Sequence, residues 1–198
     1  MSMDSEINFD PQHIIELSRQ IDAKNVLEHI EHFNHDMTIS QVVRFFENQG
    51  VEFTKTMIQN YVRLDMLPPP NEKRYYIKEH LILLTLIDNL KNVYSLDEIR
   101  RLIQPILKNI NTFDDDMIDI TAIYNLYVKI YEQTVADWQN ELPNIMNNVE
   151  ALVNASRVLE DEKNEANYFM TILALMVQSI ATKKLAEIMI ADFNKKII

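Results

Sequence analysis

Gly50 is the only glycine in this chain of 198 residues. Strand-rich folds need glycine in tight turns and bulges, where the backbone takes positive φ values that other residues avoid. The apolar fraction, 47%, is typical of a globular protein and too high for a disordered one. We therefore expect a folded and mainly α-helical protein, with strand limited to a small ribbon at about residues 66–77.

The stretch 54–103 contains the clearest local signals. Thr54 is a candidate N-cap of a helix over residues 54–67, because its hydroxyl can accept a bond from a first-turn amide. Three consecutive prolines, Pro68 to Pro70, end that helix, since proline lacks an amide donor and disfavours helix in the residue before it. A second helix is expected from about Lys78 to Asn92. Ser95 begins a third, with Glu98 completing an S-x-x-E capping box. The apolar face of the first helix consists of Met57, Ile58, Tyr61, Val62 and Met66.

The order of these elements is helix, proline turn, short ribbon, helix, turn and helix. The motifs in this order are Asn60-Tyr61-Val62, Arg63, Leu67, Pro68 to Pro70, Arg74, Tyr76, Glu79-His80-Leu81 and Ser95-Leu96-Asp97-Glu98-Ile99. On these motifs, residues 38–104 resemble the winged helix-turn-helix of MerR-type transcription regulators. They resemble more closely a bacterial family named domain of unknown function 1836, which is itself MerR-like. The chain departs from the MerR pattern at Gln59-Asn60, where Arg-Tyr is usual, and at Asp65, where glycine is usual.

This resemblance implies a transcription regulator that binds double-stranded DNA. The helix 54–67 would enter the major groove and the wing around Arg74 would contact the flanking backbone. Base contacts are expected from the N-terminal part of the helix, namely Lys55, Thr56, Gln59 and Asn60. Phosphate contacts are expected from Arg63, Lys73 and Arg74. Tyr61, Tyr75 and Tyr76 are expected in the core instead.

The net charge of −11 is the wrong sign for general nucleic-acid binding. Its distribution is uneven, however: residues 1–37 and 112–198 carry −6 and −7, whereas 38–80 and 81–111 carry +1 each. A DNA-binding face between acidic helices fits this distribution, and so does a plain solvated surface. The alternative function is a helical protein-interaction module that keeps the winged fold without binding DNA. Sensing of an unidentified small-molecule effector is compatible with either function.

Other classes of function find little support in the sequence. The absence of cysteine excludes disulfides, thiolate metal sites and cysteine nucleophiles. There is no glycine-rich phosphate loop, no nucleophile with a matching base and no paired carboxylates in an apolar setting. We expect neither enzymatic activity nor a cofactor. The polar, acidic N-terminus shows no signal peptide, so a cytoplasmic location is expected.

The N-terminal region is expected to form a helix from Pro11 that continues to about Phe33. His29, His32 and His35 are spaced three residues apart in it, which admits a metal site such as zinc. A solvated polar face is the preferred interpretation, and no metal is expected. Thr38, with Gln41, caps a further helix over 38–49, and Gly50 ends it.

Three regions are expected: an N-terminal helical extension (1–37), the MerR-like domain (38–108) and a C-terminal helical domain of long antiparallel helices (109–198). An apolar stripe near heptad spacing runs from Ile120 to Leu152, and Pro143 should kink or split its helix. Residues 166–182 carry no formal charge. A buried helix or a subunit interface is preferred there over a membrane span. The long apolar faces predict a homodimer.

Overall fold

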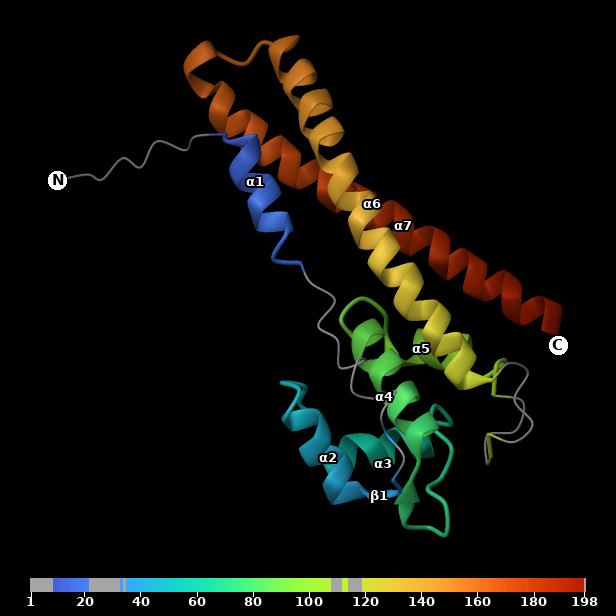
Figure 1. The fold of residues 1–198 in the computed structure, drawn as a ribbon. Helices are drawn as coiled ribbons and strands as arrows, with labels where there is room; N and C mark the ends of the chain where they lie inside the picture. The colour runs from blue at the N-terminus through green and yellow to red at the C-terminus, as the bar shows by residue number, and fades with distance from the viewer. Residues whose placement is uncertain (1–8, 22–32, 34, 108–111, 114–118, 198) are drawn as a thin grey trace. The chain divides into compact units, whose positions relative to one another are not determined.

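The computed structural model describes residues 9–21, 33, 35–107, 112–113 and 119–197 of the chain (Figure 1). The expectation of a mainly α-helical protein is confirmed. The described elements are, in order, α1 (Pro11–Ser18), β1 (Met37–Thr38), α2 (Ile39–Glu47), α3 (Lys55–Arg63), β2 (Tyr75–Tyr76), α4 (Lys78–Lys91), α5 (Leu96–Ile103), α6 (Ile120–Asn154), a 3-10 turn (Glu160–Glu162) and α7 (Lys163–Ile197). They form two compact units, one of residues 24–129 with 186–198 and the other of residues 1–23 with 130–185.

The core of the first unit is built around α4. Every residue from His80 to Thr85 is buried, so this apolar helix is enclosed on most sides. Its neighbours come from α2, α3, β2, α5, the start of α6 and the loops between them. The buried apolar residues around it are Val42, Phe46, Phe53, Ile58, Tyr61, Met66, Leu67, Tyr76, Ile99, Ile103, Leu107, Ile120 and Tyr124.

The ends of α2 confirm the local signals in the sequence. The backbone amide and the hydroxyl of Thr38 both donate to Gln41 Oε1, at 2.8 and 2.7 Å. At the other end Gly50 has φ +74°, and the Val51 amide donates to the Phe46 carbonyl. Phe53 follows this turn and is buried, with its ring edge-to-face against Phe46 at 4.6 Å between centroids.

Helix α3 starts where predicted but ends earlier. The Thr54 hydroxyl accepts from the Met57 amide at 3.1 Å. The helix was expected to continue to Leu67, yet it ends at Arg63. Asp65 takes φ 55°, and the Met66 amide donates back to the Tyr61 carbonyl at 2.9 Å. The chain therefore turns before the prolines, and Met66 and Leu67 enter the core from outside the helix.

The small sheet differs from the predicted ribbon in its pairing. β2 pairs antiparallel with β1, which precedes α2 in the sequence, with Met37 opposite Tyr76 and Thr38 opposite Tyr75. Within residues 66–77 only an isolated bridge joins Asn71 and Tyr75. A local reading of the sequence misses β1, because two residues are too few to show strand periodicity.

His80 joins the proline turn to the start of α4. Its Nδ1 accepts from the Ile77 amide at 3.1 Å, and its Nε2 lies 3.3 Å from the Pro69 carbonyl. The ring is edge-to-face with Tyr76 and Phe113. Burial lowers the pKa of this imidazole to about 4, although the Pro69 and Pro68 carbonyls act in the opposite direction. His80 is therefore a neutral structural residue at pH 7.

The second unit contains α1 and parts of α6 and α7. Gln139 of α6 donates to the Ser18 carbonyl at the end of α1, at 2.9 Å. The buried residues of α6 here are Leu142, Met146, Val149 and Val153. The predicted stripe shifts at its end, since Leu152 is 71% exposed and Val153 is buried instead. A kink or a split was predicted at Pro143; the helix is continuous through this residue, so it is not split.

Helix α7 is mostly exposed in the single chain, so of the two preferred interpretations, a buried helix or a subunit interface, the first is wrong. Only Asn167 and Thr171 are buried on it among its described side chains. By length and composition alone, residues 160–196 form the one described helix that is long and apolar enough to cross a membrane. The predicted helix beyond residue 21, with His29 and His32, lies outside the described residues.

Candidate nucleic-acid interface

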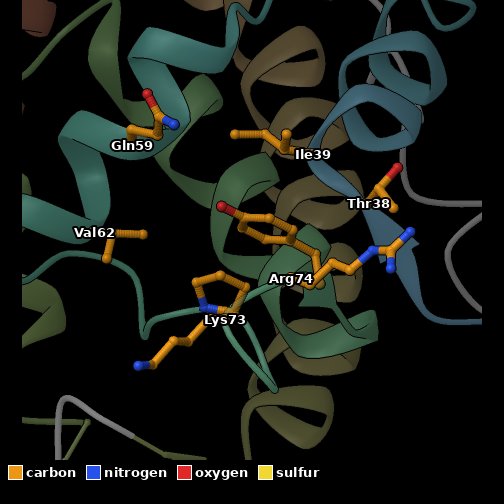
Figure 2. Close-up of a pocket in the computed structure, with 8 residues that line it drawn as sticks. Thr38, Ile39, Gln59, Val62, Lys73 and Arg74 are labelled. Atoms are coloured by element: carbon orange, nitrogen blue, oxygen red, sulfur yellow. The ribbon is translucent and has the colours of Figure 1, made fainter.

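A surface pocket of about 360 Å³ lies where α2, α3 and the loop before β2 meet (Figure 2). Thr38 and Ile39 line it from the start of α2, and Gln59 and Val62 line it from α3. The loop contributes Pro70, Lys73 and Arg74, and β2 contributes Tyr76. Three of the seven predicted DNA-contacting residues, Gln59, Lys73 and Arg74, therefore border one hollow.

The loop residues form a tight hairpin, which we call the Asn71–Tyr75 hairpin. The Asn71 amide donates to the Tyr75 carbonyl at 2.7 Å, and the Tyr75 amide donates to the Asn71 carbonyl at 2.8 Å. At its tip Glu72 and Lys73 take φ values of 51° and 63°. Two consecutive left-handed residues are typical of a type I′ turn, which normally contains Asn and Gly. The hairpin thus carries two charged residues, Glu72 and Lys73, at positions where positive φ disfavours any residue with a Cβ.

The hairpin cations extend away from the backbone in different directions. Figure 2 shows the Arg74 guanidinium on the side of Thr38 and the Lys73 amine pointing away from it. Arg74 also lies over the Tyr75 ring, 5.3 Å from its centroid. In the described part of the chain, neither cation forms an ion pair with a carboxylate. Both are available to an external anion.

The predicted residues of α3 divide into two groups. Lys55, Thr56 and Gln59 are exposed, whereas Asn60 is half-buried and its Oδ1 accepts a hydrogen bond from Arg63 Nη2. Lys55 and Thr56 lie at the start of the helix and do not line the pocket. Gln59 is therefore exposed at the pocket, whereas the side chain of Asn60 is hydrogen-bonded to Arg63.

A family model described as Domain of unknown function (DUF1836) matches residues 28–127, which is half of the chain. All the pocket residues lie within this range. The chain belongs to the DUF1836 family. It matches no curated protein and no solved structure. The DUF1836 part of the resemblance is thereby confirmed.

The tyrosines of this DUF1836 protein largely have the structural role expected of them. Tyr61 and Tyr76 are buried, at 4% and 3% exposed, and Tyr75 is half-buried. Burial raises the pKa of Tyr76, and it raises that of Tyr61, where Lys91 acts against it and Asp88 with it. Tyr76 therefore adds no negative charge to the pocket at neutral pH.

Sequence reasoning about the DUF1836 chain missed half of the pocket. The sequence predicts only a cap at Thr38, apolar packing at Val62 and a helix stop at Pro70, and it assigns no role to Ile39. Thr38 and Ile39 reach the pocket because β1 pairs with β2, which brings the start of α2 beside the hairpin. The one sequence signal for this part of the pocket was Thr38 as an N-cap. An N-cap marks the start of a helix, and the first-turn amides of a helix favour anions.

Proposed function

We propose that the DUF1836 protein is a cytoplasmic, DNA-binding transcription regulator of the MerR-like winged helix-turn-helix kind. Duplex DNA would lie across α3 and the Asn71–Tyr75 hairpin, and the hairpin would serve as the wing. The observation that carries this proposal is the shared pocket. It sets Gln59, a base-reading type of residue, beside Lys73 and Arg74, which are phosphate-binding types.

The hairpin and the start of α2 would hold the phosphate backbone. Lys73 and Arg74 supply positive charge, and Thr38 and Ile39 place the first turn of α2 at the same pocket. A helix N-terminus adds favourable dipole and amide donors for an anion. Contacts of this kind fix the register of a protein on DNA without reading its sequence.

Helix α3 would read bases from its N-terminal half. Lys55, Thr56 and Gln59 are exposed there, and a Gln side chain can bond adenine in bidentate fashion. A bidentate contact of Asn60 with adenine would use its Oδ1, which now accepts from Arg63, so Arg63 would be released to contact a phosphate. The Asn60–Arg63 pair thus links one base contact to one phosphate contact.

The charge of the whole chain limits the affinity that this face can reach. A net charge of −11 repels the phosphate backbone at long range, and only a few cations oppose it locally. Binding should therefore be modest and should weaken steeply as salt is added, because each neutralised phosphate releases counterions.

The variant Arg74→Ala tests the face directly. It should weaken binding to all duplex sequences and lower the slope of log affinity against log salt by about 1. Arg157→Ala is the matched control, since it removes the same charge from an exposed residue outside the proposed face. Fluorescence anisotropy with labelled duplexes measures both. Equal binding by parent and Arg74→Ala would refute the proposed contact.

The second candidate is a protein-interaction module that keeps this fold without binding DNA. The engagement of Asn60 by Arg63 and the acidic net charge favour it. It predicts no measurable duplex binding even at low salt, which the same titration detects.

A further inference from the structure

A further surface pocket, of about 290 Å³, lies in the second unit where the end of α1 meets one face of α6. We call it the α1–α6 pocket. Gln139 Nε2 donates to the Ser18 carbonyl at 2.9 Å, which holds the end of α1 against α6. The residues that line the pocket on either side of this bond include Arg19, Ile21, Glu132, Val135 and Ala136. All of them lie outside residues 28–127, so the family match does not cover this pocket.

The lining residues of α6 share one face of the helix. Glu132, Val135, Ala136 and Gln139 follow one another at spacings of three, one and three residues, the pattern of a single helical face. At 1.5 Å of rise per residue, Glu132 lies about 10 Å along the helix from Gln139. Arg19 directly follows Ser18 and therefore enters the pocket at the Gln139 end. The two charged residues approach the pocket from opposite ends.

The two charges of the α1–α6 pocket do not neutralise each other. Arg19 and Glu132 are both exposed, and among the described residues neither forms an ion pair with the other or with a third group. Apolar side chains line the pocket beside them: Val135 is half-buried, whereas Ile21 and Ala136 are exposed. The pocket thus offers one cation, one anion and an apolar wall.

We infer that the α1–α6 pocket binds a free apolar α-amino acid. Its carboxylate pairs with the Arg19 guanidinium, whose planar fork matches a carboxylate. Its ammonium group pairs with the Glu132 carboxylate, and its side chain packs on Ile21, Val135 and Ala136. The inference does not rest on DNA binding.

Size and charge favour this ligand over other classes. Ligand pockets range upwards from about 300 Å³, and one of about 290 Å³ suits a molecule no larger than an amino acid. A nucleotide or another polyanion would be repelled by Glu132, and a polyamine would be repelled by Arg19. A simple fatty acid would leave Glu132 without a partner. Only a ligand with both charges satisfies both ends of the pocket.

Thermal unfolding of the full chain gives the first test. Each proteinogenic L-amino acid is added separately at millimolar concentration, and a ligand that binds only the folded chain raises the unfolding temperature. At least one of leucine, isoleucine, valine, methionine and phenylalanine should raise it, whereas aspartate and lysine should not. Absence of a shift with every apolar amino acid would overturn the inference.

Calorimetry with modified ligands assigns each charge to its residue. N-acetylation removes the ammonium group and amidation removes the carboxylate, and each should raise the dissociation constant about tenfold. Arg19→Gln should bind the amino acid weakly and should no longer distinguish it from its amide. Glu132→Gln should likewise no longer distinguish it from its N-acetyl derivative. Arg157→Gln and Glu150→Gln, which remove the same charges from exposed residues outside the pocket, should bind as the parent does.

A variant that fills the α1–α6 pocket tests the location without changing any charge. Ala136→Phe places a ring in the pocket from an exposed position of α6 and should abolish binding. Circular dichroism checks that each variant is folded. Parental affinity in Ala136→Phe, or a parental preference for the unmodified amino acid in Arg19→Gln or Glu132→Gln, would place the ligand elsewhere and overturn the inference.

Discussion

At the scale of single residues, three non-glycine residues of the described chain have positive φ: Asp65, Glu72 and Lys73. Asp65 ends α3, where its left-handed conformation lets the Met66 amide reach the Tyr61 carbonyl. A side chain with a Cβ is disfavoured in that conformation by about 1–2 kcal/mol, and aspartate is among the residues that tolerate it best. The sequence showed an aspartate where MerR-like proteins have glycine, and the backbone nevertheless behaves as it would with glycine.

Asp65→Gly should therefore stabilise the fold by about 1 kcal/mol, since glycine adopts positive φ without steric cost. Asp65→Ala should destabilise it, because alanine has the Cβ and lacks the polar group that makes aspartate tolerable. Urea denaturation of the three proteins measures both changes. An Asp65→Gly protein that is less stable than the parent would contradict this account of how α3 ends.

His80 makes the stability of the fold depend on pH. Its folded pKa of about 4 lies below the ordinary value of 6.5, so the unfolded chain binds the proton more readily. The stabilisation is fully present above pH 6.5 and is lost as the pH falls towards 4. The largest effect of this single group is about 3 kcal/mol.

The variant His80→Gln isolates this contribution. Glutamine at the third helical position can still accept from the Ile77 amide, as in a capping box, but it does not titrate. The parent should lose more stability than His80→Gln between pH 7 and pH 4.5, as measured by urea denaturation at each pH. Parallel stability curves for the two proteins would show that His80 is not the cause.

At the scale of elements, the Asn71–Tyr75 hairpin combines an unfavourable backbone with exposed cations. Lys73→Gly should stabilise the fold by about 1 kcal/mol, because Lys73 has φ 63°. It should also weaken duplex binding, because a phosphate contact is lost. Lys73→Arg keeps the charge and should preserve binding without stabilising the fold. A Lys73→Gly protein that binds DNA as well as the parent would show that Lys73 at the hairpin tip does not contribute to DNA binding.

The packed side of α7 contains two buried polar atoms, Asn167 Oδ1 and Thr171 Oγ1, that accept or donate no hydrogen bond in the described structure. A buried hydroxyl without a partner costs about 1–3 kcal/mol. Thr171→Val, which keeps the shape and removes the hydroxyl, should therefore raise the free energy of unfolding. Ser179→Ala on the exposed part of the same helix is the control and should change it little. A loss of stability in Thr171→Val would show that the hydroxyl has a partner.

At the scale of the whole molecule, local signals predicted the helices well and the contacts between distant segments poorly. Thr38, Thr54 and Ser95 begin helices as predicted, because capping depends on residues three positions apart. The β1–β2 pair was missed because it joins residues far apart in sequence. The exposure of α7 was also missed, because composition shows that a helix is apolar but not what covers it.

The candidate site shows the same division. Residue types and the resemblance nominated Gln59, Lys73 and Arg74, which the structure brings to one pocket. They did not reveal the Asn60–Arg63 hydrogen bond or the approach of Thr38 and Ile39. Both depend on side-chain directions and on strand pairing, which neither propensity nor periodicity specifies.

Selection from a pool of random duplexes at low salt tests the central claim most directly. If α3 and the Asn71–Tyr75 hairpin bind DNA, the pool should become enriched in one motif. Gln59→Ala should relax the preference at one base pair of that motif by about 1–3 kcal/mol. Arg74→Ala should weaken binding to enriched and random duplexes alike. Recovery of no enriched motif, together with an Arg74→Ala protein that binds random duplexes as well as the parent, would contradict the claim.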